Sequence, residues 1–174
     1  MAVALVVGAL AVAIRLRQRQ PRFVPFIPTE PEVATVMIEL AQIRAGDVVY
    51  DLGCGDGRLV IRAMFAGASR GVCVDLDPVR MVDAQLLAQR AGVLDRIRFV
   101  VGDARKTPIG DASVVFLYLS RPLNIELAPS LRALPGGTRI VSHWHDMGSW
   151  KPDRSVHATG SQFGDRTVYL WTNR

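Results

Sequence analysis

The residues with the clearest chemical potential lie in the segment VVYDLGCGDG, residues 48–57. Gly53, Gly55 and Gly57 stand at every second position, directly after an apolar run that ends in Asp51. Glycine tolerates tight turns with positive φ and lets the backbone approach a ligand closely. A lone glycine pair would fit a plain strand-to-helix turn, whereas this denser pattern, preceded by an acid, favours a ligand-binding loop.

The glycine spacing also indicates which ligand the loop suits. The dinucleotide fingerprint is G-x-G-x-x-G, and its third glycine allows close packing beside a pyrophosphate. Here that third position is Arg58, and Asp51 and Asp56 lie beside the turn. Because carboxylates repel a pyrophosphate, the segment favours a ligand that carries a cationic amino group and a sulfonium.

Alternating strand and helix patterns position this loop. The predicted strands are 48–52, 71–74, 97–101, 114–119 and 139–142, and the predicted helices are 31–43, 58–66, 78–91 and 123–134. The last segments, 155–158 and 167–172, flank a polar loop and predict a hairpin. We therefore predict an α/β fold with a doubly wound, mostly parallel seven-stranded sheet, closed by a C-terminal antiparallel hairpin. Ligands of such sheets bind at the carboxyl ends of the strands.

Two further acids close later strands. Asp75 ends the apolar run of GVCVDLDP, and Asp103 follows the third strand in FVVGDARK. Asp77 rivals Asp75, but it precedes Pro78 and is expected to cap the next helix. Acids that close three successive strands form a more specific signal than any one of them.

Together these motifs resemble the class I S-adenosylmethionine-dependent methyltransferases, over roughly residues 31–174. The resemblance implies a Rossmann-like fold and S-adenosylmethionine as cofactor. It implies that Asp75 accepts hydrogen bonds from the ribose hydroxyls and that Asp103 contacts the adenine amino group. The cofactor-binding residues that it implies are Asp51, Gly53, Cys54, Gly55, Asp75, Leu76, Gly102, Asp103 and Ala104.

The acceptor site is less clearly marked. Adenine and glutamine methyltransferases of this class carry an Asn-Pro-Pro-Tyr type of sequence after the fourth strand, whereas residues 117–120 here read Leu-Tyr-Leu-Ser. Methylation of adenine or glutamine is therefore disfavoured. Tyr118 and Ser120 are acceptor-pocket candidates by position, although Tyr118 fits a core aromatic equally well. His143 is a third candidate, because imidazole titrates near neutral pH, but no catalytic residue is assigned firmly.

The proline-containing segment before the first helix and the run DLGCGDGRLVI are similar to small protein lysine methyltransferases of archaea and mitochondria. This similarity implies N-methylation of a protein lysine. A small-molecule or lipid acceptor, and a noncatalytic cofactor-binding protein, are the alternatives. Histidines at i, i+2 in SHWHD lack the spacing of zincins, so we predict no metal site.

The N-terminal segment MAVALVVGALAVAI is apolar, and several arginines follow it within residues 15–22. As a helix it would span about 21 Å, against about 30 Å for a hydrocarbon core. Basic residues after the segment favour an anchor with the catalytic domain in the cytoplasm; a soluble cytoplasmic protein is the alternative. We predict a transmembrane anchor in residues 1–20, a proline-rich linker in 21–30 and the methyltransferase domain in 31–174.

Charge bears on a nucleic-acid partner, and cysteine content bears on the redox compartment. The formal net charge is +5, but several basic residues sit in the N-terminal stretch, which leaves the domain closer to neutral. No basic face with interleaved aromatics is visible, so we predict no nucleic-acid partner. Cys54 and Cys73 make neither a disulfide framework nor a zinc pattern, which favours a reducing compartment.

Overall fold

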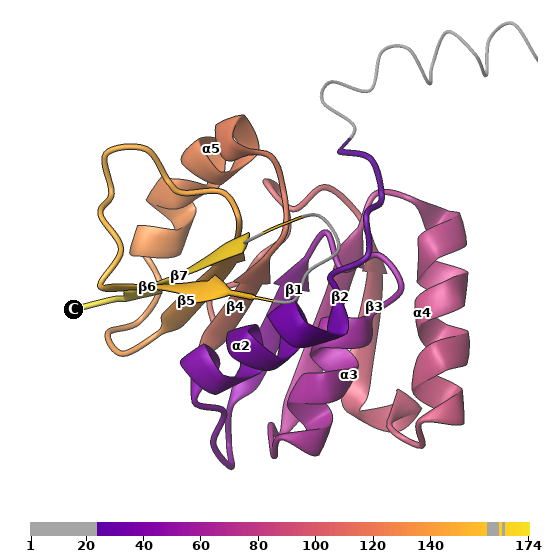
Figure 1. The fold of residues 1–174 in the computed structure, drawn as a ribbon. Helices are drawn as coiled ribbons and strands as arrows, with labels where there is room; N and C mark the ends of the chain where they lie inside the picture. Colours follow the sequence, from indigo (N-terminus) through magenta and orange to yellow (C-terminus); the bar gives the residue numbers. More distant parts are fainter. Residues whose placement is uncertain (1–23, 160–163, 165) are drawn as a thin grey trace, which may run out of the picture.

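The computed structural model describes residues 24–159, 164 and 166–174, and a seven-stranded sheet organises them (Figure 1). The strands are β1 (Val48–Leu52), β2 (Arg70–Asp75), β3 (Ile97–Val101), β4 (Val114–Leu117), β5 (Arg139–His143), β6 (Arg154–Ala158) and β7 (Arg166–Thr172). Their order is β3-β2-β1-β4-β5-β7-β6. The first five pair in parallel, and β7 pairs antiparallel with β5 and β6. The predicted fold class is confirmed.

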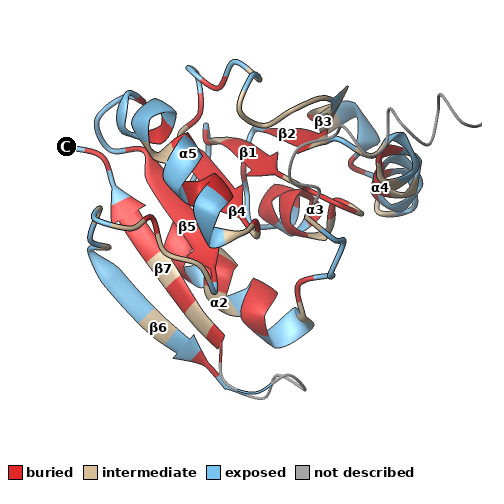
Figure 2. Ribbon diagram, turned by 90° about the horizontal axis from the view of Figure 1, so that it is seen from above, coloured by how far each residue is buried: buried red, intermediate tan, exposed pale blue. Residues whose placement is uncertain are grey.

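Helices cover both faces of the sheet. They are α2 (Pro31–Ala41), α3 (Arg58–Phe65), α4 (Pro78–Arg90) and α5 (Arg121–Arg132), with a short 3₁₀ turn at Leu94–Arg96. Buried side chains of α2, α3 and α4 pack on one face, and those of α5 on the other. Figure 2 shows the buried central strands between these layers, with β6 largely exposed at the edge.

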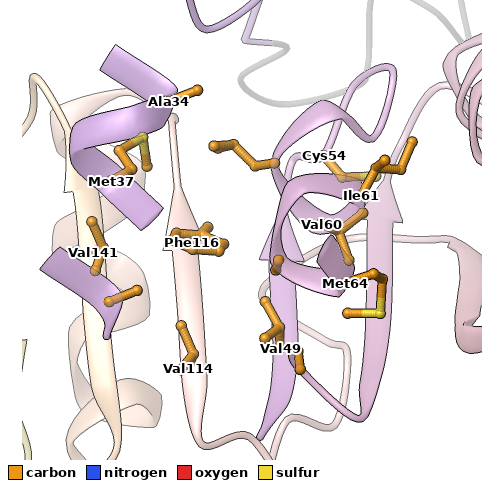
Figure 3. Close-up of a cluster of buried hydrophobic side chains, with 14 of the residues drawn as sticks. Ala34, Met37, Val49, Cys54, Val60, Ile61, Met64, Val114, Phe116 and Val141 are labelled. Carbon is orange, nitrogen blue, oxygen red and sulfur yellow. The ribbon is translucent and has the colours of Figure 1, made fainter. Parts of the chain in front are cut away.

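The strand sequences explain why both faces are apolar. Successive side chains of a strand point to opposite faces, so in β1 Val49 joins the core beneath α3 while Tyr50 and Leu52 join the core beneath α5. Figure 3 shows the first of these cores, where Met37 of α2 lies in the same cluster as Val141 and Phe116 of the sheet. A central strand buried on both sides reads as a nearly continuous apolar run.

A buried ion pair ties the amino edge of the sheet together. Arg139, at the start of β5, lies 2.5 Å from the Asp47 carboxylate and donates to the carbonyls of Ala41 and Gln42 at 2.8 and 2.6 Å. Thr172, at the end of β7, lies opposite Arg139 at this same edge. These contacts occupy the amino ends of the parallel strands. The loops at the opposite, carboxyl ends are free to form a site.

The prediction of a membrane span needs correction. Within the described residues, no helix is long and apolar enough to cross a membrane. The longest of them, α4, has 13 residues, whereas a span needs about 20. Residues 1–20, on which the transmembrane and membrane-association predictions rested, lie outside the described residues.

Candidate active site

A pocket of about 270 Å³ opens at the carboxyl edge of the sheet. Its walls come from the loops after β1, β2, β3 and β4, from residues 144–145 after β5, and from residues 24–29, which we call the strap. The predicted site residues that line it are Asp51, Gly53, Cys54, Gly55, Asp75, Leu76, Gly102, Asp103, Ala104, Tyr118 and Ser120. His143 is not among the lining residues.

The glycine loop after β1 is docked on the end of β2. The backbone N–H groups of Gly53 and Cys54 both donate to the Val74 carbonyl, at 2.8 and 3.0 Å. Gly53 and Gly55 have φ of +79° and +55°, in the left-handed region, where a side chain would strain the backbone. The glycines therefore allow the loop to turn tightly onto β2, which leaves space for the pocket above the strand ends.

Asp75 is positioned by backbone donors on both of its carboxylate oxygens. Oδ2 accepts from the Gly55 N–H and Oδ1 from the Asp77 N–H, each at 2.9 Å. Each oxygen keeps further acceptor capacity, so the carboxylate can also take hydroxyl groups of a ligand. Asp77 behaves as predicted for a helix cap, because its Oδ1 accepts from the Val79 N–H of α4 at 2.8 Å.

Asp51 sits deepest of the three acids and is only 3% exposed. Burial raises the pKa of Asp51 to about 8, and the negative charge of Asp75 contributes in the same direction. At neutral pH this carboxyl is therefore mostly protonated until a cation comes close enough to favour the charged form.

Asp103 follows β3 and is held by its neighbour. Arg105 forms an ion pair with Asp103, with 2.6 Å between Nη2 and Oδ2, and its hydrogen bonds lower the pKa of Asp103. Asp103 is thus anionic at neutral pH. We call the part of the pocket formed by Asp51, Asp75 and Asp103 the acidic end.

The part of the pocket that we call the aromatic end is formed by Tyr118, Trp144 and His145. The strand β4 ends at Leu117, two residues earlier than predicted, so Tyr118 lies in the loop before α5. Trp144 is 43% exposed and has a positive φ of 67°. Non-glycine residues in this region often belong to functional sites, and the backbone N–H of Trp144 is held by the Thr167 carbonyl at 2.7 Å.

His143 differs from the prediction. It is only 2% exposed and packs against Tyr118, with 3.8 Å between the ring centroids. Burial, with a smaller effect of the Arg166 charge, lowers the pKa of His143 to about 4. The imidazole is therefore neutral at pH 7, and neither ring nitrogen has a hydrogen-bond partner. His143 was predicted as a candidate because imidazole titrates near neutral pH, and its burial removes that reason.

The strap carries residues that the sequence reasoning missed. Phe26 lies directly over the glycine loop, since a Cβ placed on Gly55 would fall 2.4 Å from its Cε2 atom. The Arg80 guanidinium lies 4.8 Å from the centre of the Phe26 ring, and Arg58 donates to the Thr29 carbonyl at 2.9 Å. The available signal was an aromatic residue among prolines, which indicates a segment packed on the domain.

The described residues contain a disulfide bond, which corrects the prediction that the two cysteines make no disulfide framework and favour a reducing compartment. It joins Cys54 in the glycine loop to Cys73 in β2, with 5.4 Å between their Cα atoms. The two cysteines belong to different elements, and only the return of the loop onto β2 brings them together. Among the described residues, no group of three His, Cys, Asp or Glu side chains is placed to hold a metal ion.

The fold and this pocket define an S-adenosylmethionine-dependent methyltransferase, and comparison with known proteins agrees. Residues 51–154 match the family model of the ANTKMT methyltransferase domain. The chain therefore belongs to the ANTKMT methyltransferase family, and its cofactor is S-adenosylmethionine. The residues present fit that cofactor, because the acidic end offers carboxylates to a cationic ligand and the glycine loop gives it room.

Three known proteins are similar to this chain. A protein-lysine N-methyltransferase of Saccharolobus islandicus is 35% identical over 150 residues, which cover 85% of this chain and 92% of the relative. An RNA methyltransferase from Salinibacter ruber, solved with S-adenosyl-L-homocysteine, is 46% identical with a TM-score of 0.76, over 84% of this chain and 93% of that chain. The ribosomal protein L11 methyltransferase of Yersinia pestis is 36% identical over 90 residues, covering 52% of this chain and 30% of the relative.

Proposed function

We propose that this methyltransferase transfers a methyl group to the side-chain amine of a lysine in a protein. The observation that carries the proposal is the similarity to the Saccharolobus islandicus lysine methyltransferase, which extends over 92% of that protein. The aromatic end of the pocket supports it, because Tyr118 and Trp144, with the neighbouring Leu119, form an apolar wall that suits the alkyl chain of a lysine.

In this proposal the acidic end holds the cofactor. Asp75 accepts hydrogen bonds from the ribose hydroxyls, Asp103 from the adenine amino group, and Asp51 lies beside the cationic amino group. S-adenosylmethionine supplies an electrophilic methyl group when it is bound. The main task of the chain is then to align the acceptor amine with the methyl–sulfur bond and to exclude water.

A lysine must lose its proton before it can accept a methyl group. Desolvation disfavours the ammonium form and lowers the lysine pKa, and the aromatic end provides such an environment. The same physical effect is visible at His143, whose pKa is lowered by burial. The proton can leave to water at the pocket mouth, so no dedicated base is required.

RNA is the second candidate acceptor, because the Salinibacter ruber relative is an RNA methyltransferase. The charges around the pocket argue against it. The lining arginines Arg58, Arg80 and Arg105 each form an ion pair with an aspartate of this chain, at 2.6, 3.0 and 2.6 Å. Their positive charge is thereby compensated, whereas RNA binding rests on cations that neutralise phosphates.

A labelling experiment separates the two acceptors. The full-length protein is incubated with methyl-labelled S-adenosylmethionine and a cell extract, with and without ribonuclease or protease. We expect the label to resist ribonuclease, to be lost with protease, and to appear as methyl-lysine after acid hydrolysis. Label that is lost with ribonuclease would refute the lysine proposal, and the Asp75→Ala variant provides the background level.

A further inference from the structure

The disulfide between Cys54 and Cys73 lies at the cofactor site, and the methyl transfer proposed above assigns it no role. Cys54 lines the pocket with 6% of its surface exposed, while Cys73 is fully buried in β2. The bond thus connects the glycine loop to the strand that carries Asp75, which is two residues beyond Cys73.

We propose that Cys54 and Cys73 form a reversible thiol–disulfide site that sets the affinity for the cofactor and that is reduced by a dithiol. This site goes beyond the proposed lysine methylation and does not depend on which acceptor the enzyme uses.

The loop should respond to reduction because its surroundings are tight. Bonded sulfur atoms lie about 2 Å apart, whereas unbonded heavy atoms need about 3.5–4 Å. Cys73 has little room to retreat, since it is fully buried in β2, which lies between β1 and β3. Cys54, which borders the pocket, is therefore the residue that moves.

A displaced Cys54 disturbs the contacts that hold the cofactor loop. Its own N–H and that of Gly53 donate to the Val74 carbonyl, and the N–H of Gly55 donates to Asp75. Lengthening these hydrogen bonds moves the loop relative to Asp75. Reduction should therefore weaken cofactor binding, and the disulfide form is the organised one.

The chemistry is a thiol–disulfide exchange that balances without any further reactant. A thiolate of the dithiol attacks the Cys54 Sγ from the pocket, the bond to Cys73 breaks, and Cys73 leaves as a thiolate that takes up a proton. The second thiol of the reductant then releases Cys54 as a free thiol. The protein gains two electrons and two protons, and the reductant becomes a disulfide.

Cys54 lines the pocket and is only 6% exposed, so a bound cofactor should shield the bond from that side. By linkage, a tenfold preference of the cofactor for the oxidised protein would lower the reduction potential of the pair by about 30 mV.

The test uses the full-length protein, purified without reductant and then split into an oxidised and a dithiothreitol-treated sample. Calorimetry with S-adenosyl-L-homocysteine should show about tenfold weaker binding to the reduced sample. Alkylation followed by mass spectrometry should show reduction at least tenfold slower when this ligand is saturating. Equal affinities in the two samples, or two alkylated thiols before any reductant is added, would overturn the proposal.

The variant Cys73→Ala provides the matched control, because it cannot form the bond and removes the crowding sulfur. Its affinity for S-adenosyl-L-homocysteine should be the same with and without dithiothreitol. If this variant is poorly folded by circular dichroism, the double variant Cys54→Ala, Cys73→Ala takes its place. A dithiothreitol effect of equal size in either folded variant would show that the cysteine pair is not its cause.

Discussion

The acidic end and the aromatic end of the pocket are built in different ways. At the acidic end, Asp51, Asp75 and Asp103 each follow or close a strand, and Asp75 is fixed by two backbone N–H groups. At the aromatic end, Tyr118 and Trp144 stand in loops and depend on contacts from elements far away in the sequence. A common cofactor can thus be kept by the frame of the sheet, while loop residues adjust to the acceptor.

The variant Asp75→Ala should give the largest effect at the acidic end. It removes an acceptor that we assign to the ribose hydroxyls, and a charge-assisted hydrogen bond contributes about 1.5–3 kcal/mol. Calorimetry should show at least tenfold weaker binding of S-adenosyl-L-homocysteine. Asp77→Ala is the matched control: it loses a helix cap, should cost about 1 kcal/mol of stability, and should not reproduce the loss of affinity. Unchanged affinity in a folded Asp75→Ala protein would contradict the assignment.

At the aromatic end, Tyr118→Ala should act on the acceptor alone. It removes part of the apolar wall that we propose for the lysine alkyl chain, so kcat/KM for a protein acceptor should fall about tenfold, or about 1.4 kcal/mol. The affinity for S-adenosyl-L-homocysteine should stay within twofold. Tyr118→Phe keeps the ring against His143 and should restore most of the activity. If Tyr118→Ala lowers only thermal stability, Tyr118 is a core aromatic and the comparison loses its support at this end.

The strap should give a smaller effect on the cofactor. Phe26→Ala removes a partly exposed ring above Gly55, which corresponds to about 1 kcal/mol of apolar contact. We expect about fivefold weaker cofactor binding by calorimetry. Phe65→Ala is the control, since Phe65 on α3 is 68% exposed and does not line the pocket. Similar losses in both variants would mean that Phe26 acts only through general destabilisation.

The smallest expected effect is the release of a proton from Asp51 when the cofactor binds. The folded, ligand-free protein holds this proton up to a pKa of about 8, whereas the unfolded chain releases it in the ordinary acidic range. The raised pKa therefore contributes stability that is lost as the pH rises toward 8. A cationic cofactor favours the carboxylate, so its binding at pH 7 should release about half a proton to one proton.

This release is measured by calorimetry in two buffers of different ionisation enthalpy. Asp51→Asn should abolish the difference between the buffers. If the wild-type protein shows no such difference, Asp51 is already ionised or lies away from the cofactor's amino group.

The same contrast explains how far the sequence could predict the structure. The run that ends in Asp51 and the glycines after it are local signals, because a strand and a tight turn follow from neighbouring residues. Leu117, where β4 ends, already depends on pairing with β1 and β5. The sequence therefore predicted the succession of strands and helices along the chain well, but it placed the end of β4 two residues late.

What the sequence could not predict depends on contacts between distant segments. His143 looks titratable as a residue type, and only its burial against Tyr118 makes it a neutral imidazole. Phe26 became part of the pocket because the strap folds back over Gly55. The bond between Cys54 and Cys73 likewise requires the loop to return to β2. Such features need the three-dimensional arrangement, since no short sequence pattern encodes them.

The placement of β7 has a practical consequence for handling the enzyme. Because β7 runs antiparallel to β5, it ends at the amino edge of the sheet, where the Gly137 N–H donates to the Asn173 carbonyl at 2.8 Å. The strap, in contrast, lies on the pocket itself. A fusion partner or a solid support joined after Arg174 would therefore leave the pocket mouth accessible to a bulky protein acceptor, whereas a bulky group joined close to Val24 would obstruct it.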